Sequence, residues 1–101
     1  MLVVTGRMTI KQAQMPDLLA AASTMAAETT AEVGCGAYRF GVDVDDRAVV
    51  HLFEQWDSPE SLDAHFATPH FSAFSEVLLA SVDGEAEFTR YEVSAKAPLF
   101  G

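Results

Sequence analysis

The segment 48–56 has apolar side chains at both odd-numbered and even-numbered positions, and this feature constrains the fold more than any other. Two of them face one side of an extended strand and three face the other: Val49 and Phe53, then Val50, Leu52 and Trp56. A half-buried strand of an antiparallel sheet alternates apolar and polar residues, whereas a strand without that alternation is covered on both faces. The sheet that contains segment 48–56 therefore needs a cover on each face.

Three other segments also have the pattern of strands: 2–10, 38–44 and 85–94. The first is rich in β-branched residues and alternates in polarity. The second is separated from segment 48–56 by the polar residues Asp45-Asp46-Arg47, which predicts a hairpin between the two. The third follows Asp83-Gly84, a pair that is typical of turns. The sequence thus predicts four strands.

Proline marks the start of each predicted helix. Pro16 begins a segment whose apolar residues recur at spacings of three and four, which is the pattern of a helix with one buried face. The pairs Ser58-Pro59 and Thr68-Pro69 each combine a hydroxyl N-cap with proline in the first turn. They predict two short successive helices in place of one long one.

The resulting order is strand, helix, strand, strand, two helices, strand. It predicts an α+β, ferredoxin-like βαββαβ fold whose second helix is split in two, formed by residues 1–101 as a single domain. Helices in this arrangement cover one face of the antiparallel sheet and leave the other bare. Since segment 48–56 needs cover on both faces, and symmetric dimers are the commonest assemblies, we expect a homodimer that packs sheet against sheet.

The charge of the chain excludes some classes of partner. Fifteen acidic and six basic residues give a net charge of −9, which repels nucleic-acid phosphates and anionic membrane surfaces. No apolar run approaches the length of a membrane span, and the N-terminus does not have the pattern of a secretory signal. The single cysteine, Cys35, has no partner for an internal disulfide. We therefore expect a cytoplasmic protein that binds neither nucleic acid nor membranes.

Residues 34–71 contain an ordered set of motifs that is similar to a known family. The most specific element is Glu54-x-Trp56, followed nine residues after the tryptophan by His65, with the aromatic Phe71 near the start of the next helix. In this order and spacing the chain resembles the antibiotic biosynthesis monooxygenase family over roughly residues 2–94. The resemblance implies a dimeric α+β barrel. It also implies oxidation of quinols or polycyclic polyketides by molecular oxygen without metal or flavin.

Glu54 and His65 are the candidate catalytic residues. Glu54 shares its parity with Trp56, and His65 shares a helical face with Leu62, so both side chains are expected to point into the interior. A buried carboxylate needs a partner, and a carboxylate that orients an imidazole prepares a general base. We hypothesise that His65 takes a proton from a phenol or hydroquinone while Glu54 stabilises the imidazolium. The alternative is a structural pair that ties the helix to the sheet.

Several other residues are candidates for binding a substrate. Trp56, Tyr38 and Phe71 would line an aromatic pocket for a flat molecule, although aromatic residues at these spacings also serve as ordinary core. Arg7 lies at a strand position that would face the inside of a dimeric barrel, where it would hold an anionic ligand or form salt bridges. The three histidines have no local metal-binding spacing, so we predict no bound metal.

The leading hypothesis is therefore a cofactor-independent monooxygenase that oxidises a quinol or polyketide-like aromatic with O2. Two alternatives use the same pocket. One is a non-catalytic dimer that binds aromatic ligands or is associated with stress, and the other is an isomerase or cyclase that uses the same base without oxygen. Oxygen uptake separates the leading hypothesis from both.

Overall fold

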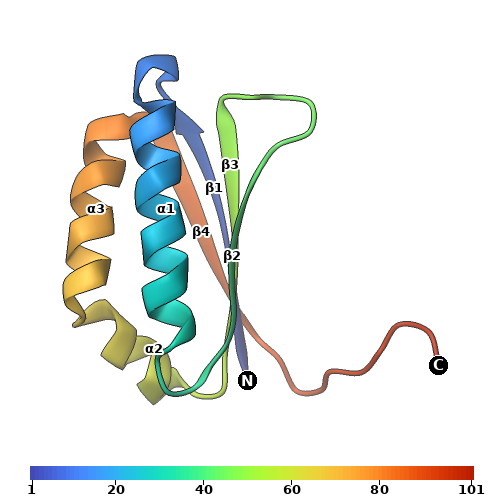
Figure 1. The fold of residues 1–101 in the computed structure, drawn as a ribbon. Helices are drawn as coiled ribbons and strands as arrows, with labels where there is room; N and C mark the ends of the chain where they lie inside the picture. The colour runs from blue at the N-terminus through green and yellow to red at the C-terminus, as the bar shows by residue number, and fades with distance from the viewer.

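Three helices cover one face of a four-stranded antiparallel sheet in the computed structural model, which describes residues 1–101 (Figure 1). The elements follow the order β1 (Leu2–Ile10), α1 (Met15–Thr30), β2 (Cys35–Val42), β3 (Val49–Trp56), α2 (Pro59–Phe66), α3 (Pro69–Ser81) and β4 (Val82–Glu92). A short 3-10 turn, Gln12–Gln14, precedes α1. The strand order in the sheet is β2-β3-β1-β4. The predicted ferredoxin-like fold with a split second helix is confirmed.

The two predicted N-caps divide the second helical segment as expected. Ser58 Oγ accepts a hydrogen bond from the backbone N–H of Ser61, and Thr68 Oγ1 accepts one from the backbone N–H of Phe71. Thr68 Oγ1 also donates to the backbone carbonyl of His65, at 2.8 Å. The hydroxyl of Thr68 therefore joins the end of α2 to the start of α3, and it holds His65 close to the first turn of α3.

The core lies between the sheet and the helices. The even-numbered residues of β1 point towards it, and Met8 and Ile10 are fully buried there. Trp56, at the end of β3, is the largest fully buried side chain. Gly6 lies at the centre of β1, opposite Leu52 on one side and Phe88 on the other. A Cβ atom at Gly6 would lie 2.8 Å from the Phe88 ring, so the glycine lets that ring lie over the sheet.

The predicted turn at Asp83-Gly84 is wrong. Strand β4 begins at Val82, immediately after α3, and both residues lie within the strand. Gly84 has a φ of +89°, and the register between β1 and β4 shifts nearby. Residues of this type mark bulges as well as turns, because both need a backbone conformation that glycine adopts easily. The pair lies where the register with β1 shifts, at the start of an edge strand.

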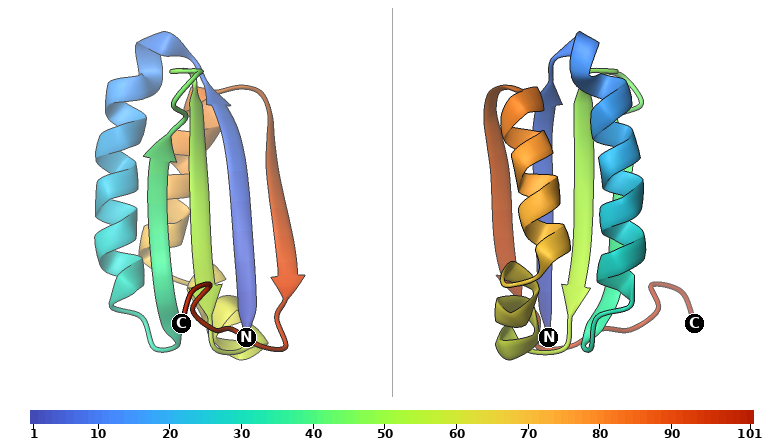
Figure 2. Two further views of the ribbon diagram at one scale, coloured as in Figure 1. Left: turned by 90° about the vertical axis from the view of Figure 1, so that its right-hand side faces the viewer. Right: turned by 60° about the vertical axis from the view of Figure 1, so that its left-hand side comes forward.

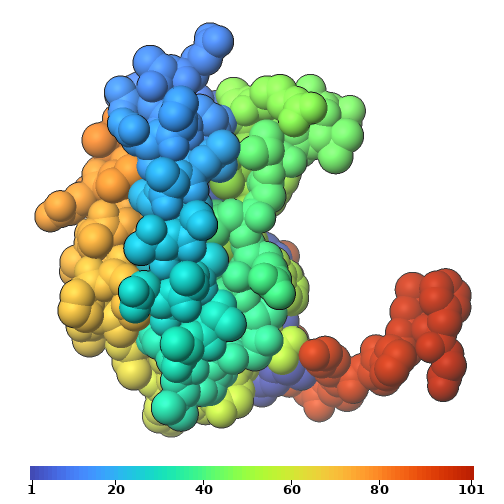
Figure 3. All heavy atoms as spheres, in the orientation of Figure 1, coloured from blue at the N-terminus to red at the C-terminus, as the bar shows by residue number.

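The sheet face opposite the helices is bare, as predicted (Figure 2, left). Arg7 and His51 are neighbours across β1 and β3 on this face, and the Phe53 side chain there is 42% exposed. The tail after β4 extends away from the body on the same side, and it carries the exposed side chains of Leu99 and Phe100 (Figures 1 and 3). The expected homodimer would cover this face and stays a prediction. None of the helices is long and apolar enough to span a membrane.

Candidate functional site

A cavity of about 340 Å³ lies between the helices and the helix-facing side of the sheet. Its volume is within the range of small-molecule sites. Ten of its twelve lining residues are hydrophobic, which suits an apolar or aromatic ligand. They come from both layers: Val4, Tyr38, Leu52 and Phe88 from the sheet, and Met25, Leu62, Phe66, Phe71, Phe74 and Leu78 from the helices. The other two are Glu54 and Ser75.

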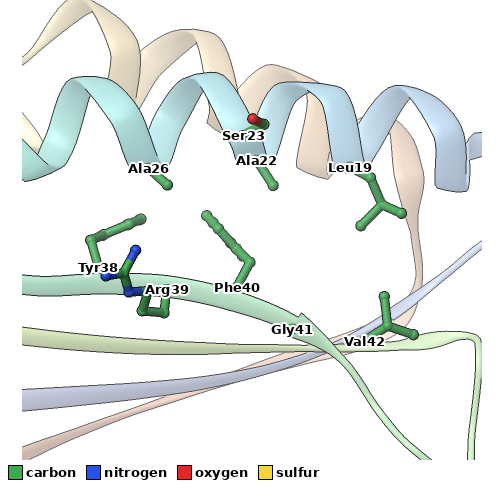
Figure 4. Close-up of a pocket in the computed structure, with 9 residues that line it drawn as sticks. All are labelled: Leu19, Ala22, Ser23, Ala26, Tyr38, Arg39, Phe40, Gly41 and Val42. Atoms are coloured by element: carbon green, nitrogen blue, oxygen red, sulfur yellow. The ribbon is translucent and has the colours of Figure 1, made fainter.

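A second hollow, of about 320 Å³, lies between α1 and β2 (Figure 4). Leu19 of α1 and Phe40 of β2 point into it from opposite sides. Tyr38 and Arg39 are the only ionisable residues along it, and no carboxylate or imidazole faces it. The cavity that contains Glu54 is therefore the better candidate for a site with acid–base chemistry.

Glu54 is the single carboxylate in the wall of this cavity. Its side chain is only 6% exposed, and its Oε1 atom accepts a hydrogen bond of 2.9 Å from Nε1 of Trp56, two residues further along β3. Burial raises the pKa of Glu54, whereas the Trp56 donor partly opposes the increase. No protein group donates to Oε2 of Glu54. The second oxygen is therefore free to accept a proton or hydrogen bond from a ligand, and the raised pKa makes the carboxylate a stronger base.

The predicted pair between Glu54 and His65 is wrong. His65 is 1% exposed, and its Nδ1 donates to Oε2 of Glu32, at 2.7 Å. The reason is the indole of Trp56, which donates to Glu54 and also packs against the His65 ring with centroids 4.9 Å apart. Both side chains point inwards as expected, but the donor to Glu54 is the indole of Trp56 and not the imidazole of His65. His65 does not line the cavity.

Glu32 is the residue that sequence reasoning missed. It lies in the loop between α1 and β2, and the same oxygen that accepts from His65 accepts a second bond of 2.8 Å from Nε2 of His70. Nothing in the surrounding sequence distinguishes it from other loop acids. The side chain of His70 is only 17% exposed and takes part in this cluster.

Tyr38 and Phe71, two of the residues predicted to bind a substrate, both line the cavity. Their rings pack against His65 with centroid distances of 5.5 and 5.2 Å. Burial, and then the negative charge of Glu54, raise the pKa of Tyr38, so its hydroxyl stays protonated and can donate a hydrogen bond. Two other predicted binding residues do not reach the cavity: Trp56 lies behind Glu54, and Arg7 is on the bare face of the sheet.

Residues 1–77 match the family model of the antibiotic biosynthesis monooxygenases. The chain belongs to this family. The resemblance seen in the sequence is thereby confirmed. The matched residues include the whole wall of the cavity except Leu78 and Phe88. The match therefore covers most of the residues that form the cavity wall.

Solved structures support the same fold. Rv0793 from Mycobacterium tuberculosis is 24% identical, with a TM-score of 0.88 over 96% of this chain and 98% of that one. A protein described as an antibiotic biosynthesis monooxygenase is 25% identical, with a TM-score of 0.87 over 94% and 100%. PA3566 from Pseudomonas aeruginosa is 24% identical, with a TM-score of 0.84 over 93% and 94%. No curated protein sequence matches significantly. Family and neighbours support a monooxygenase in general terms.

The burial of His65 predicts a pH-dependent stability. Burial lowers the pKa of His65 below its ordinary value of 6.5, against the opposing effect of Glu32. Near that pH the unfolded chain then binds more protons at this residue than the folded chain does, so the free energy of unfolding falls as the pH drops below about 6.5. In His65→Asn, the amide can still donate to Glu32 but does not titrate. Urea denaturation at pH 7.5, 6.5 and 5.5 measures the free energy of unfolding. This free energy should fall less with decreasing pH in the variant than in wild type, and an equal fall in both proteins would contradict the prediction.

Proposed function

We propose that this chain is a cofactor-independent monooxygenase that oxidises a flat phenol or hydroquinone with O2 in the cavity beneath the helices. One observation carries the proposal: a largely apolar cavity has a single carboxylate in its wall, with a raised pKa and one free oxygen. Apolar walls select an aromatic ring, and the carboxylate provides a base where the hydroxyl of that ring would lie.

The reaction begins with transfer of the phenolic proton to Glu54. The resulting phenolate is electron-rich and gives one electron to O2, which forms a phenoxyl radical and superoxide. These combine at a ring carbon that is ortho or para to the hydroxyl and carries a hydrogen atom, where a C–O bond forms and yields a peroxide. Loss of the ring C–H proton and cleavage of the O–O bond leave a quinone. The proton held by Glu54 and the ring proton leave with the second oxygen atom as water, so one phenol and one O2 give one quinone and one H2O.

The neighbouring residues support this step in different ways. The protonated hydroxyl of Tyr38 is suited to donate a hydrogen bond to the oxygen of the phenolate, and Phe71 offers a ring surface against the substrate. The hydrogen bond from Trp56 holds one oxygen of Glu54 and leaves the other for the substrate. His65 was expected to be the base. It packs behind Tyr38 and Phe71, so we assign it the role of positioning these rings.

Filling the cavity should block the reaction. In Leu78→Trp, a larger side chain would occupy space that the substrate needs, and we expect KM for a hydroquinone to rise at least about tenfold. The matched control is Leu79→Trp, because Leu79 is the next residue of α3 and its side chain is 77% exposed. Oxygen uptake, followed with an oxygen electrode, should be unchanged in the control.

The same assay separates the proposal from the alternatives. Oxygen uptake that depends on the phenol and is impaired by Leu78→Trp supports a monooxygenase. Saturable binding of the phenol without oxygen uptake or product would instead identify a non-catalytic binding protein. Product formed in the absence of oxygen would identify an isomerase or cyclase.

We further propose that two copies pack through the bare face of the sheet. Phe53 and Tyr91 expose apolar rings there, and the tail with Leu99 and Phe100 extends on the same side. Light scattering should give twice the chain mass of 10.9 kDa, and Phe53→Glu should give monomers because it would bury two carboxylates in the interface. Leu79→Glu, on the helical side, should remain dimeric. A monomeric wild type or a dimeric Phe53→Glu would overturn this proposal.

A further inference from the structure

Three potential metal ligands converge beside the cavity, outside its wall. Glu32 comes from the loop after α1, His65 from the last turn of α2 and His70 from the first turn of α3. Their nearest oxygen and nitrogen atoms all lie within 4.8 Å of one another. No local sequence pattern indicates this site, because the carboxylate is separated from the histidines by more than thirty positions and only the fold brings them together.

The cluster is held in place by the surrounding structure. The ring of His65 is buried against the rings of Trp56 and Phe71. The Thr68 hydroxyl bonds to the His65 carbonyl, which fixes the joint between the helices that carry the two histidines. Preorganised side chains of this kind lose little freedom when they bind a ligand. The Glu32 and His70 side chains are 15% and 17% exposed, so an ion can reach them from solvent.

The donor set suits a divalent transition-metal ion. Two imidazole nitrogens and one carboxylate oxygen are the protein ligands of open zinc sites, in which water takes the fourth position. Tetrahedral bonds of about 2.0–2.1 Å would place neighbouring ligand atoms roughly 3.3 Å apart. The Glu32 oxygen now lies 2.7 and 2.8 Å from the two nitrogens. A displacement of this oxygen by about half an ångström would open the position for the ion, and the terminal torsion of a glutamate is soft.

Metal binding also requires that the proton on each imidazole ring change its position. Each histidine now donates an N–H group to the Glu32 carboxylate, since a carboxylate only accepts. To bind a metal, Nδ1 of His65 and Nε2 of His70 must each present a lone pair. A neutral imidazole does this when its proton moves to the other ring nitrogen, so neither ring needs to lose its proton.

We propose that Glu32, His65 and His70 form a binding site for one divalent transition-metal ion, represented by Zn²⁺. The ion would replace the two hydrogen bonds that now join the residues, and it would cross-link the loop after α1 to α2 and α3. Because the three ligands lie outside the cavity wall, the site is separate from the one proposed for the phenol.

The test is calorimetric titration of ZnCl2 into protein that has been treated with a chelator and then freed of it. Wild type should bind one Zn²⁺ per chain, and its melting temperature should rise with added zinc. His70→Ala should bind at least about 100-fold more weakly, because loss of an outer-shell partner alone already costs ten- to a hundredfold. The control is His51→Ala, which removes an exposed histidine that pairs with Asp43 elsewhere. It should bind like wild type.

Cobalt provides a second measurement that does not depend on the stability of one variant. Co²⁺ bound by two nitrogens and an oxygen in tetrahedral geometry should give strong visible absorption in wild type and in His51→Ala. Both Glu32→Gln and His70→Ala should lack it while keeping a wild-type circular dichroism spectrum. Absence of stoichiometric zinc binding by wild type would overturn the proposal, as would zinc affinity that is unchanged in His70→Ala. Neither result depends on oxygen uptake.

Discussion

Glu54→Gln is expected to lower the rate of phenol-dependent oxygen uptake by at least about 100-fold, which is the usual contribution of a general base. Glutamine has the shape of glutamate, and its carbonyl oxygen can still accept the hydrogen bond from Trp56. It cannot take the phenolic proton. The loss should therefore appear in kcat, with binding of the phenol and the circular dichroism spectrum preserved.

The pH dependence of the wild-type rate provides a check on the same prediction. Only ionised Glu54 can accept a proton, and burial raises its pKa above the ordinary value of 4.5. The rate should fall as the pH drops through this raised pKa. Glu76→Gln makes the same chemical change at an exposed position of α3 and should keep the wild-type rate and pH profile. Wild-type activity in Glu54→Gln would remove this residue from the mechanism.

Trp56→Ala is expected to reduce the free energy of unfolding by about 3–5 kcal/mol, the usual cost of truncating a fully buried aromatic side chain. Trp56 is 0% exposed, and its removal would also leave Glu54 without its donor. The loss is a large fraction of the roughly 5–15 kcal/mol that stabilises a typical domain. Urea denaturation at neutral pH measures it directly.

Two further variants separate the contributions of this tryptophan. Trp56→Phe keeps much of the apolar volume but removes the N–H donor. It should therefore reduce the free energy of unfolding by less than Trp56→Ala does, and it should still raise the pKa of Glu54. Phe100→Ala truncates an exposed aromatic side chain of the tail and should change stability by less than about 0.5 kcal/mol. A loss below about 1 kcal/mol in Trp56→Ala would contradict the packing described for the core.

The fold could be predicted from the sequence because its signals are local. The N-caps at Ser58 and Thr68 act within three residues, and the alternation in β1 reports directly which side chains face the core. The boundary of β4 could not be predicted in the same way. Asp83 and Gly84 are compatible with both a turn and a bulge, and the choice depends on pairing with β1, which is remote in sequence.

In the candidate site, too, local features could be predicted from the sequence and contacts between remote residues could not. That Glu54 and His65 point inwards follows from strand and helix periodicity. The partner of Glu54 is two residues away on the same face of β3, so this contact was also within reach of sequence reasoning. The partner of His65 is not, because Glu32 lies 33 positions earlier in an irregular loop. Periodicity indicates which side chains are buried, but it does not indicate which of them meet.

The proposed function requires that the cavity bind a phenol with its hydroxyl at Glu54. A crystal structure of the chain with a flat hydroquinone, prepared without oxygen, would show where the phenol binds. The ring should lie among the apolar side chains of α2 and α3, with one hydroxyl oxygen about 2.6–3.2 Å from Oε2 of Glu54. A hydroquinone bound elsewhere, or one whose hydroxyl groups point away from Glu54, would rule out Glu54 as the base.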